Sequence, residues 1–465
     1  MDVNDVFEAL RAADQDHVLR FYDQLDADSR RQLEDQVSAL DLPLIARLTR
    51  DREVACDWAA LARRSTPPPA FRLDGRDARF GADEARERGE AALRAGKVAA
   101  FLVAGGQGTR LRFPHPKGMF PIGPVSHNCL FQILLERILA TARRCRTSIP
   151  VFLMTSPATH QETIAFLNEH KRFGLPADDL YVLCQGVMPA VDARTGKLLL
   201  SAKDSLALAP DGHGGMLAAF ANSGSLARAR ERGVQQLSYV QIDNPLAQVC
   251  QPSLIGYHLL AESEMTSQVI EKRYPLEKVG NVVVVDGKMR IIEYIDLPDD
   301  RAHQRHPDGS LVIWAGSIAV HVFDVDFLER LTGQADALPF HRALKKVACI
   351  DEQAVPREPM IPNAIKFERF IFDLLPWARN AVVVEGDPSE VFAPVKNADE
   401  QSDVDTPNTA HAAIARLHTR WLRDAGAEVR DGVPVEISPL WALDAADVAR
   451  RVRTPLIVDE PTYFH

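Results

Sequence analysis

The apolar run Val98–Val103 is followed directly by the glycine-rich segment AGGQGTRL at 104–111. A continuous apolar run of this length is typical of a parallel strand that is buried on both faces. Ligands of open α/β sheets bind beyond the carboxyl ends of such strands, and glycines there let backbone N–H groups approach a ligand closely. This segment therefore predicts a buried strand that ends at a ligand-binding loop.

Two well-known glycine motifs do not fit this loop. A P-loop has Lys and then Ser or Thr directly after its last glycine, and a dinucleotide fingerprint has a third glycine where Leu111 stands. Instead, Arg110 comes two residues after Gly108, and Lys117 follows seven positions later. Arg offers a planar fork to phosphate oxygens, whereas Lys offers a mobile point charge. The two cations favour a phosphate-binding loop over a glycine turn with solvated charges.

Strand-like and helix-like segments alternate around this loop. Further strands are predicted at 151–154 and 237–242, and helices at 83–95, 129–143 and 156–170. The alternation predicts an α/β fold with a mostly parallel sheet that is covered on both faces. Asp286-Gly287, between apolar runs at 282–285 and 289–294, predicts a hairpin, so the sheet is expected to be mixed.

The length of 465 residues predicts more than one domain. Leu33, Val37 and Leu40 have helical spacing, which predicts a helical N-terminal region over 1–95, interrupted by the three prolines at 67–69. The alternating segments place the central α/β domain at 96–386. Short apolar runs with Pro and Asp predict a small β-rich C-terminal domain at 387–465.

Charge and composition restrict the possible partners and location. A net charge of -10 argues against nonspecific nucleic-acid binding, since phosphate backbones need a basic face. We expect no signal peptide, because the first residues are acidic and lack an apolar core, and no membrane span. The six cysteines, including Cys56, form no CxxC pair, which favours reduced thiols in a cytoplasmic protein. The oligomeric state is left open, and a monomer is possible.

Three other positions are candidates for the site. Asp243 ends a predicted strand, where a carboxylate could hold Mg²⁺ or simply form a turn before Asn-Pro. Gln185 has the donor and acceptor needed for a pyrimidine edge. Lys396 lies in a predicted loop and could equally be a solvated surface charge. A further glycine-rich loop at 209–215 could contact a base or a ring.

Taken in order, these segments resemble the eukaryotic-type UDP-N-acetylhexosamine pyrophosphorylases of the UDP-sugar pyrophosphorylase group. The resemblance extends from about residue 96 to the end, and more loosely over the N-terminus. The segments that carry it are AGGQGTRL at 104–111, PKGMF at 116–120, SHNCLFQ at 126–132, LMTS at 153–156, CQGVMPA at 184–190, APDGHGG at 209–215, QIDNPL at 241–246, WAGSIAVH at 314–321, KFERFIFD at 366–373, VKNAD at 395–399 and EISPL at 436–440.

The resemblance implies a Rossmann-like, GT-A-like nucleotidyltransferase domain that converts UTP and a sugar 1-phosphate into UDP-sugar and pyrophosphate. It implies that Arg110, Lys117 and Lys396 bind phosphates and that Asp243 binds Mg²⁺. The nucleotide would contact Ala104, Gly105, Gly106, Gln185, Gly212 and His213. The sugar and its phosphate would contact Gly280, Glu293, Trp314, Ser317, Lys366, Phe370 and Phe372.

The sequence departs from the family pattern at five positions. Arg112 replaces a usual glycine, His213 a usual asparagine and Asn128 a usual lysine. Trp314 and Ser317 stand where the N-acetylhexosamine enzymes have the two asparagines of NAGN. Because of these two positions, the sequence does not identify the sugar substrate. N-acetylglucosamine 1-phosphate is the first choice, and glucose or galactose 1-phosphate is the alternative. A non-catalytic UDP-sugar-binding protein and, more remotely, a dinucleotide oxidoreductase are the other classes.

Overall fold

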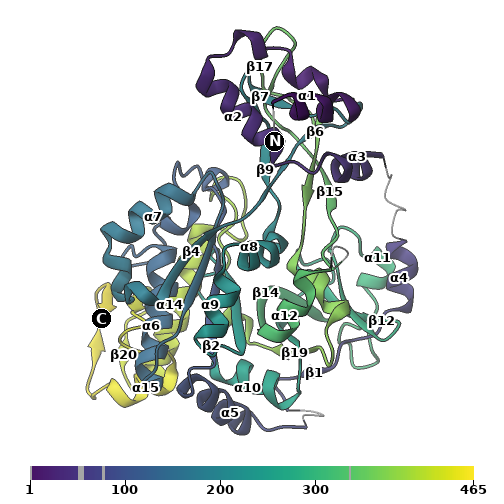
Figure 1. The fold of residues 1–465 in the computed structure, drawn as a ribbon. Coiled ribbons are helices and arrows are strands. Elements are labelled where there is room, and N and C mark those ends of the chain that lie inside the picture. Colours follow the sequence, from purple (N-terminus) through teal and green to yellow (C-terminus); the bar gives the residue numbers. More distant parts are fainter. Residues whose placement is uncertain (1–2, 51–56, 76–78, 335–336) are drawn as a thin grey trace. The chain divides into compact units, whose positions relative to one another are not determined.

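The computed structural model describes residues 3–50, 57–75, 79–334 and 337–465 (Figure 1). The chain forms two compact units, and each contains segments that are distant in the sequence. Unit 1 comprises Met1–Asp57, Gln185–Gly215 and Ala335–Asp373. Unit 2 comprises Trp58–Cys184, Met216–Gln334 and Leu374–His465. The predicted catalytic segment 96–386 therefore contributes to both units, whereas the predicted C-terminal segment lies within unit 2.

Unit 2 is built on a ten-stranded mixed sheet. Its strands β10, β2, β3 and β4 are parallel neighbours, and β11, β19 and β1 form a second parallel group. Strand β14 joins the two groups by pairing antiparallel with β10 and with β11, and it also pairs with β12 of the hairpin β12–β13. In the order of the sheet, the strands are Ala70–Phe71 (β1), Val382–Glu385 (β19), Met265–Glu271 (β11), Ala315–Asp324 (β14), Gln236–Gln241 (β10), Val98–Val103 (β2), Val151–Thr155 (β3) and Leu180–Cys184 (β4), with Gly280–Val285 (β12) and Lys288–Ile292 (β13) at the side. The predicted mixed, mostly parallel α/β sheet is confirmed.

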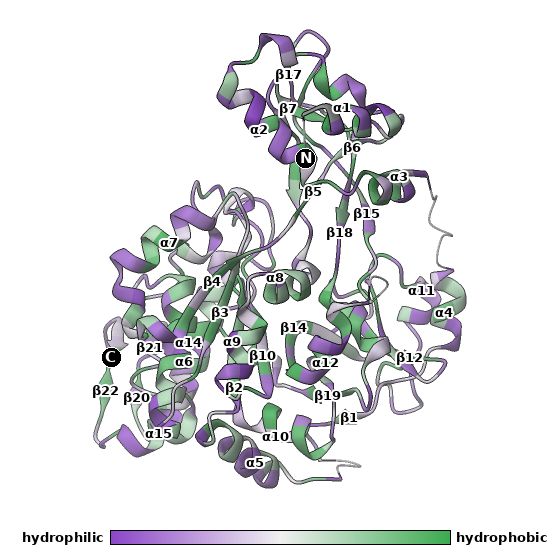
Figure 2. Ribbon diagram, in the orientation of Figure 1, coloured by the Kyte–Doolittle hydropathy of each residue, from purple (hydrophilic) through white to green (hydrophobic). Residues whose placement is uncertain are grey.

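Helices cover this sheet, and their inward faces complete its core. Leu130–Cys145 (α6) buries Leu134 and Ile138 in the same cluster as Leu102 and Leu153 of the strands. Figure 2 shows hydrophilic residues on the outward side of Ala82–Arg94 (α5), which packs against Pro252–Leu260 (α10). Further helices of unit 2 are His160–Glu169 (α7), Met216–Asn222 (α8), Ser225–Glu231 (α9), Asp299–Ala302 (α11) and Val325–Thr332 (α12).

The contact between α5 and α10 depends on two glycines. A Cβ atom on Gly256 would lie 1.6 Å from the carbonyl oxygen of Ala85, and a Cβ on Gly89 would lie 1.8 Å from that of Pro252. No side chain fits in these distances, so the backbones approach as closely as they do only because both residues are glycine.

Most predicted elements of unit 2 are present, with shifted ends. Strand β2 has the predicted bounds, and Cys129, the first residue of a predicted helix, caps α6. The helix predicted at 156–170 begins only at His160, because the Ser156 N–H donates to the Thr159 hydroxyl in a turn. The predicted hairpin turn is present, with positive φ at Asp286 and Gly287.

The C-terminal segment of unit 2 contains short paired strands and one long helix. Glu428–Val429 (β20) pairs with Ile457–Val458 (β22), and Val435–Ile437 (β21) pairs with Thr462–Phe464 (β23). The predicted β-rich segment did not include its longest element, Pro407–Asp424 (α14). This helix begins with a capping box formed by Thr406 and Thr409 and has Pro407 in its first turn, which are recognisable start signals. The short helices Pro388–Val391 (α13) and Ala445–Arg451 (α15) flank it.

Unit 1 combines N-terminal helices with short strands from later in the chain. The helices Val3–Ala12 (α1), Ala27–Ser38 (α2) and Leu42–Arg50 (α3) confirm the helical N-terminus. Leu33 and Val37 are buried on α2, whereas Leu40, the third residue of the predicted spacing, follows the end of that helix. Trp58–Arg64 (α4) belongs to unit 2. The strands of unit 1 are Val187–Pro189 (β5), Val191–Asp192 (β6), Leu200–Ala202 (β7), Ser205–Leu206 (β8), Leu208–Pro210 (β9), His341–Lys345 (β15), Cys349–Ile350 (β16), Pro356–Arg357 (β17) and Ala364–Glu368 (β18).

The core of unit 1 draws on all three of its chain segments. Leu10 and Leu33 from the N-terminus pack with Leu200 from the second segment and Phe367 from the third. Its N-terminal helices therefore share one hydrophobic cluster with the strands.

Two further predictions concern cysteines and membranes. Cys129, Cys145, Cys184, Cys250 and Cys349 are free thiols, and Cys56 lies outside the described residues. Across residues 3–50, 57–75, 79–334 and 337–465, helices long and apolar enough to cross a membrane are absent.

Candidate functional site

The glycine-rich loop leaves strand β2 and folds back on itself. The Ala104 N–H donates to the Met154 carbonyl of β3, and the Gly105 carbonyl accepts from the Ser156 hydroxyl. The Lys117 N–H donates to the Gly106 carbonyl at 3.0 Å, which fixes the base of Lys117 against the first glycines of the loop. Almost all side chains of β2 and β3 are buried, so the loop begins at the carboxyl ends of two inner strands of the sheet.

Two residues of the loop have unusual backbone requirements. A Cβ on Gly108 would lie 2.7 Å from the Phe113 carbonyl oxygen and 2.8 Å from that of His115, so this position has room only for glycine. Arg112, which replaces a usual family glycine, has φ of 54°. This left-handed conformation favours glycine and explains the family preference at that position.

Four predicted site residues of unit 2 form one electrostatic cluster. The Lys117 Nζ lies 3.6 Å from an Asp243 carboxylate oxygen, and both side chains are largely buried. Burial lowers the pKa of Lys117, Asp243 partly restores it, and the charges of Lys396 and Arg110 lower it further. The structure therefore brings Arg110, Lys117, Asp243 and Lys396 together, although they are spread over almost 300 residues of the sequence.

Asn244 connects the two parts of the chain that supply Asp243 and Lys396. Its buried amide donates to the Val391 carbonyl and accepts from the Ala393 N–H. The neighbouring Asp243 carbonyl accepts from the Val395 N–H at 2.8 Å. These bonds fasten the segment before Lys396 to the end of β10. The sequence predicted only a turn at Asn244. The family segment QIDNPL, which contains this residue, was the signal that could have indicated a structural role for it.

Lys396 has an acidic neighbour that sequence reasoning did not identify. A carboxylate oxygen of Asp405 lies 3.8 Å from the Lys396 Nζ, and the Asp405 carbonyl accepts from the Lys396 N–H. The main chain of the same segment also contacts the glycine-rich loop, because the Ala398 N–H donates to the Arg110 carbonyl.

Asp243 is the predicted metal ligand, and its surroundings bear on that role. Groups of three or more His, Cys, Asp or Glu side chains placed to hold a metal ion are absent from the described parts of the chain. Mg²⁺ commonly uses one or two carboxylates and completes its shell with water and substrate phosphates. A largely buried carboxylate beside Lys117, Arg110 and Lys396 fits that type of site.

Three predicted sugar-binding residues meet where the hairpin joins strand β14. Gly280 pairs with Ser317 across β12 and β14. A Cβ on Gly280 would lie 3.5 Å from a Glu293 carboxylate oxygen and 3.9 Å from the Ser317 Cβ. The same Cβ would lie 2.8 Å from the Ile291 side chain, so glycine keeps this corner open.

The Trp314 ring does not join this group. It is 6% exposed, and the Arg72 guanidinium lies 3.7 Å from the ring centroid. Arg72 in turn binds Glu271 and Glu385. Trp314 and Ser317 are three residues apart along an extended chain, so their side chains point to opposite faces. The flat face that could have accepted a sugar ring is covered by Arg72.

Three of the predicted nucleotide-binding residues, Gln185, Gly212 and His213, lie in unit 1. Gln185 is buried, and Gly212 has φ of 85°. A Cβ on Gly212 would lie 2.4 Å from the Arg369 carbonyl oxygen, so this loop requires glycine there. The His213 Nδ1 accepts from the Ile371 N–H, which places the proton of a neutral ring on Nε2.

His213 also belongs to an aromatic group with two predicted sugar-site residues. Its ring centroid lies 5.4 Å from Phe370 and 5.8 Å from Phe372, and the two phenylalanines stack on each other. Lys366 lies on β18 and alternates with the buried Phe367, so its side chain points to the other face of the strand.

Asp211 is a further unusual residue of unit 1. A Cβ on Gly215 would lie 2.1 Å from one of its carboxylate oxygens, and a Cβ on Gly186 would lie 3.1 Å from the other. Burial raises the pKa of Asp211 to about 6, and the charge of Arg369 opposes this shift. Its position before Gly212 could have indicated a role in holding the glycine loop.

These features define the class of protein. The model of the UTP–glucose-1-phosphate uridylyltransferase family matches residues 63–418, and the chain belongs to this family. It is 35% identical to UDP-N-acetylhexosamine pyrophosphorylase-like protein 1 of Mus musculus, over 98% of this chain and 97% of that protein. It is 33% identical to UDP-N-acetylglucosamine diphosphorylase 2 of Arabidopsis thaliana, over 93% of this chain and 88% of that protein.

A solved structure agrees with the fold. The uridine diphosphate N-acetylglucosamine pyrophosphorylase of Trypanosoma brucei superposes with a TM-score of 0.81 at 24% identity, covering 100% of this chain and 98% of that chain. These findings confirm the family resemblance that the sequence motifs indicated.

Proposed function

We propose that this protein is a uridylyltransferase that makes UDP-N-acetylglucosamine and pyrophosphate from UTP and N-acetylglucosamine 1-phosphate. The observation that carries the proposal is the convergence of Arg110, Lys117, Asp243 and Lys396 in a chain that belongs to this family. The names of its relatives favour the N-acetylated sugar over glucose 1-phosphate. A cytoplasmic location is part of the proposal and is supported by the free thiols.

The chemistry requires positioning and charge neutralisation more than acid–base catalysis. The attacking group is a phosphate oxygen of the sugar 1-phosphate, which is largely ionised at neutral pH since its second pKa is about 6. The obstacle is to bring two polyanions into line at the α-phosphorus of UTP. Arg110, Lys117 and Lys396 would bind the phosphates and offset their charge.

The remaining site residues receive the roles that the sequence motifs predict. Asp243 would hold Mg²⁺, which supplies further charge neutralisation at the phosphates when it is bound. The backbone at Ala104, Gly105 and Gly106, with Gln185, Gly212 and His213, would bind the uridine. Gly280, Glu293 and Ser317 would bind the sugar, with Lys366, Phe370 and Phe372 near the sugar phosphate.

The deciding experiment measures pyrophosphate release from UTP with a panel of sugar 1-phosphates, with and without Mg²⁺. We expect release to require Mg²⁺ and the kcat/KM to be highest for N-acetylglucosamine 1-phosphate. A clear preference for glucose or galactose 1-phosphate would support the alternative substrate. UDP-sugar binding without any pyrophosphate release would instead indicate a non-catalytic binding protein.

A further inference from the structure

Asp405 constrains Lys396 through both its main chain and its side chain. The Asp405 carbonyl accepts from the N–H groups of Lys396 at 2.7 Å and of Asn397 at 3.0 Å. Its carboxylate lies 3.8 Å from the Lys396 Nζ, which is an ion pair too long for a good hydrogen bond. Asp405 has φ of 57°, an uncommon conformation that Asp tolerates better than most residues. The loop from Lys396 to Asp405 is thus closed at Asp405, while the ammonium group is held loosely.

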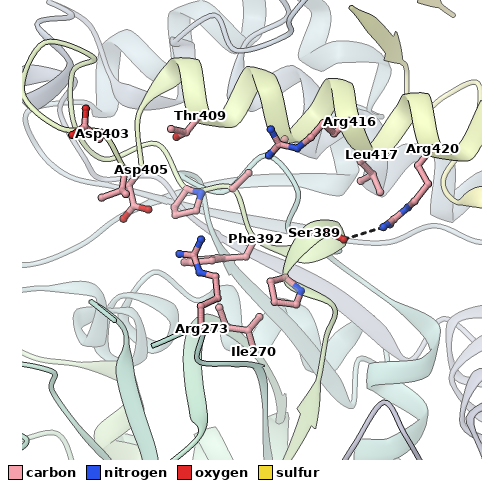
Figure 3. A pocket seen from close by; sticks show the side chains of 15 residues that line it. Ile270, Arg273, Ser389, Phe392, Asp403, Asp405, Thr409, Arg416, Leu417 and Arg420 are labelled. Atoms are coloured by element: carbon pink, nitrogen blue, oxygen red, sulfur yellow. Dashed lines mark hydrogen bonds between the residues drawn. The ribbon is translucent and has the colours of Figure 1, made fainter. Parts of the chain in front are cut away.

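The Asp405 carboxylate shares a cavity with a second cation, Arg273, which also pairs with Glu277 through its Nε and Nη2. The cavity, of about 570 Å³, lies between the end of β11 and helix α14 (Figure 3). In this view both side chains point into the cavity. Burial raises the pKa of Asp405, and the charges of Asp243 and Glu277 raise it too, whereas those of Lys396 and Arg273 lower it. The cavity gives the carboxylate room to turn from one cation to the other.

The surrounding charges explain why Lys396 needs such a partner. Arg110, Lys117 and Lys396 are like charges in one cluster, and the charges of Lys396 and Arg110 add to the effect of burial in lowering the pKa of Lys117. Without a polyanion, Asp405 offsets part of this repulsion. A triphosphate or pyrophosphate carries more negative charge than one carboxylate and competes for the ammonium group.

Building on the proposed uridylyltransferase activity, we propose that Asp405 is a positioning residue that exchanges partners during turnover. Between turnovers its carboxylate holds Lys396 beside the phosphate site. When UTP is bound, Lys396 pairs with phosphate and Asp405 turns toward Arg273. As pyrophosphate leaves, Asp405 takes Lys396 back and so weakens the hold on the product.

This exchange predicts opposite effects for two substitutions. Asp405→Asn leaves the phosphates as the main anionic partner of Lys396, so the Ki of pyrophosphate as a product inhibitor should fall about five-fold, the effect of a modest ion pair. The kcat should fall as well, while the KM for UTP should not rise. Arg273→Gln removes the alternative partner of Asp405, so the same Ki should rise. A merely structural defect would weaken pyrophosphate binding in both variants.

The experiment compares pyrophosphate inhibition of the full chain in the wild type, D405N, R273Q, K396A and the K396A/D405N double variant. Asp403→Asn is the matched control, because Asp403 lies in the same loop and cavity wall but is exposed. We expect D403N to match the wild type, and we expect D405N to have no effect on the Ki once Lys396 is absent.

The outcomes separate this inference from the proposed function. If the wild type releases no pyrophosphate from UTP, the proposed function is wrong. If the wild type is active but D405N does not tighten pyrophosphate binding, the exchange is wrong and the function stands. If D405N fails to fold, R273Q decides, since an unchanged or lowered Ki there contradicts the exchange.

Discussion

Arg110 and Lys117 differ in how firmly the protein holds them. Lys117 is largely buried beside Asp243, whereas the Arg110 side chain is exposed. Removing either cation should lower kcat at least about 100-fold, because each stabilises charge that the reaction brings together. Steady-state rates of R110A and K117A measure this effect.

The same loop supplies a control for these two variants. Arg112 is exposed and lies 3.8 Å from Glu400, and Arg112→Gly keeps its left-handed backbone. This variant should retain near-normal turnover. Near-normal turnover in R110A and K117A as well would contradict the phosphate assignment.

Ser317, rather than Trp314, is placed to affect the choice of sugar. Ser317 adjoins Gly280 and Glu293, whereas the Trp314 ring is covered by Arg72. Ser317→Asn should raise kcat/KM for N-acetylglucosamine 1-phosphate relative to glucose 1-phosphate by about three- to ten-fold, the effect of one added hydrogen bond. Trp314→Asn should lower Tm and leave that ratio unchanged. A shift of the ratio in W314N alone would reverse this assignment.

Asp211 should make the stability of the protein depend on pH between about 4 and 6. Its folded-state pKa of about 6 lies above the ordinary value of 3.8. The folded protein therefore binds a proton that the unfolded chain releases, and the wild type loses stability as pH rises through this range. Asp211→Asn removes the titration, so the Tm of the variant minus that of the wild type should increase from pH 4 to pH 7.

Thermal unfolding of both proteins over a pH series measures this difference. Only its change with pH matters, because the substitution also alters contacts with Arg369 that are independent of pH. A Tm difference that stays constant or decreases toward pH 7 would show that the buried charge of Asp211 does not destabilise the folded protein.

At the scale of elements, the close contact of α5 with α10 allows the effect of packing on stability to be tested. A Gly→Ala change inside a helix ordinarily stabilises by about 0.5–1 kcal/mol. Gly256→Ala should instead destabilise by about 2 kcal/mol or more, since its Cβ would lie 1.6 Å from the Ala85 carbonyl oxygen and the helices must separate. Tm measurements on G256A check this expectation.

Gly333 provides the matched control, because it has negative φ and, among the residues that the structure describes, no atom lies within 4 Å of an added Cβ. Gly333→Ala should leave Tm almost unchanged. Equal Tm values for G256A and G333A would mean that the two helices can separate at little cost.

The sequence predicted elements best where the signal was local. Strand β2 and the Asp286-Gly287 hairpin follow from short patterns of apolar and turn residues. Helix α14 was not predicted, because the surrounding Pro and Asp residues suggested short strands. Its capping box and Pro407 are start signals that the sequence does contain. The helix at 156–170 was predicted too long because side-chain bonding of Thr159 competes with the helix.

At the scale of the whole molecule, the predicted site residues belong to two units. The residues predicted to bind phosphates and the predicted sugar-binding residues of the hairpin lie in unit 2. Gln185, Gly212, His213 and the 366–372 segment lie in unit 1. Family motifs could name these residues, because a motif is read along the chain. Motifs could not predict that Trp314 is covered by Arg72 or that Asp405 faces Lys396, since both contacts join residues that no single motif contains.

Deleting residues 1–57 should disable the protein although this segment contains none of the predicted site residues. Its side chains share a core with Leu208 and Phe367, which adjoin the glycine loop and the aromatic segment of unit 1. We expect the 58–465 chain to expose this apolar surface, to lose solubility or Tm, and to lose pyrophosphate release from UTP. A soluble and fully active truncation would show that the N-terminal helices are dispensable for unit 1.

Unit 1 is assembled from three stretches of chain that unit 2 segments separate. A unit of this kind cannot be transferred between genes as one continuous block of coding sequence. Replacing one of these stretches with the matching stretch of a relative would supply only part of the core, without the residues against which that part packs. The two units must therefore be inherited together, and variation in the sugar or base preference of such proteins is expected to arise by point substitution at residues such as Ser317 and His213.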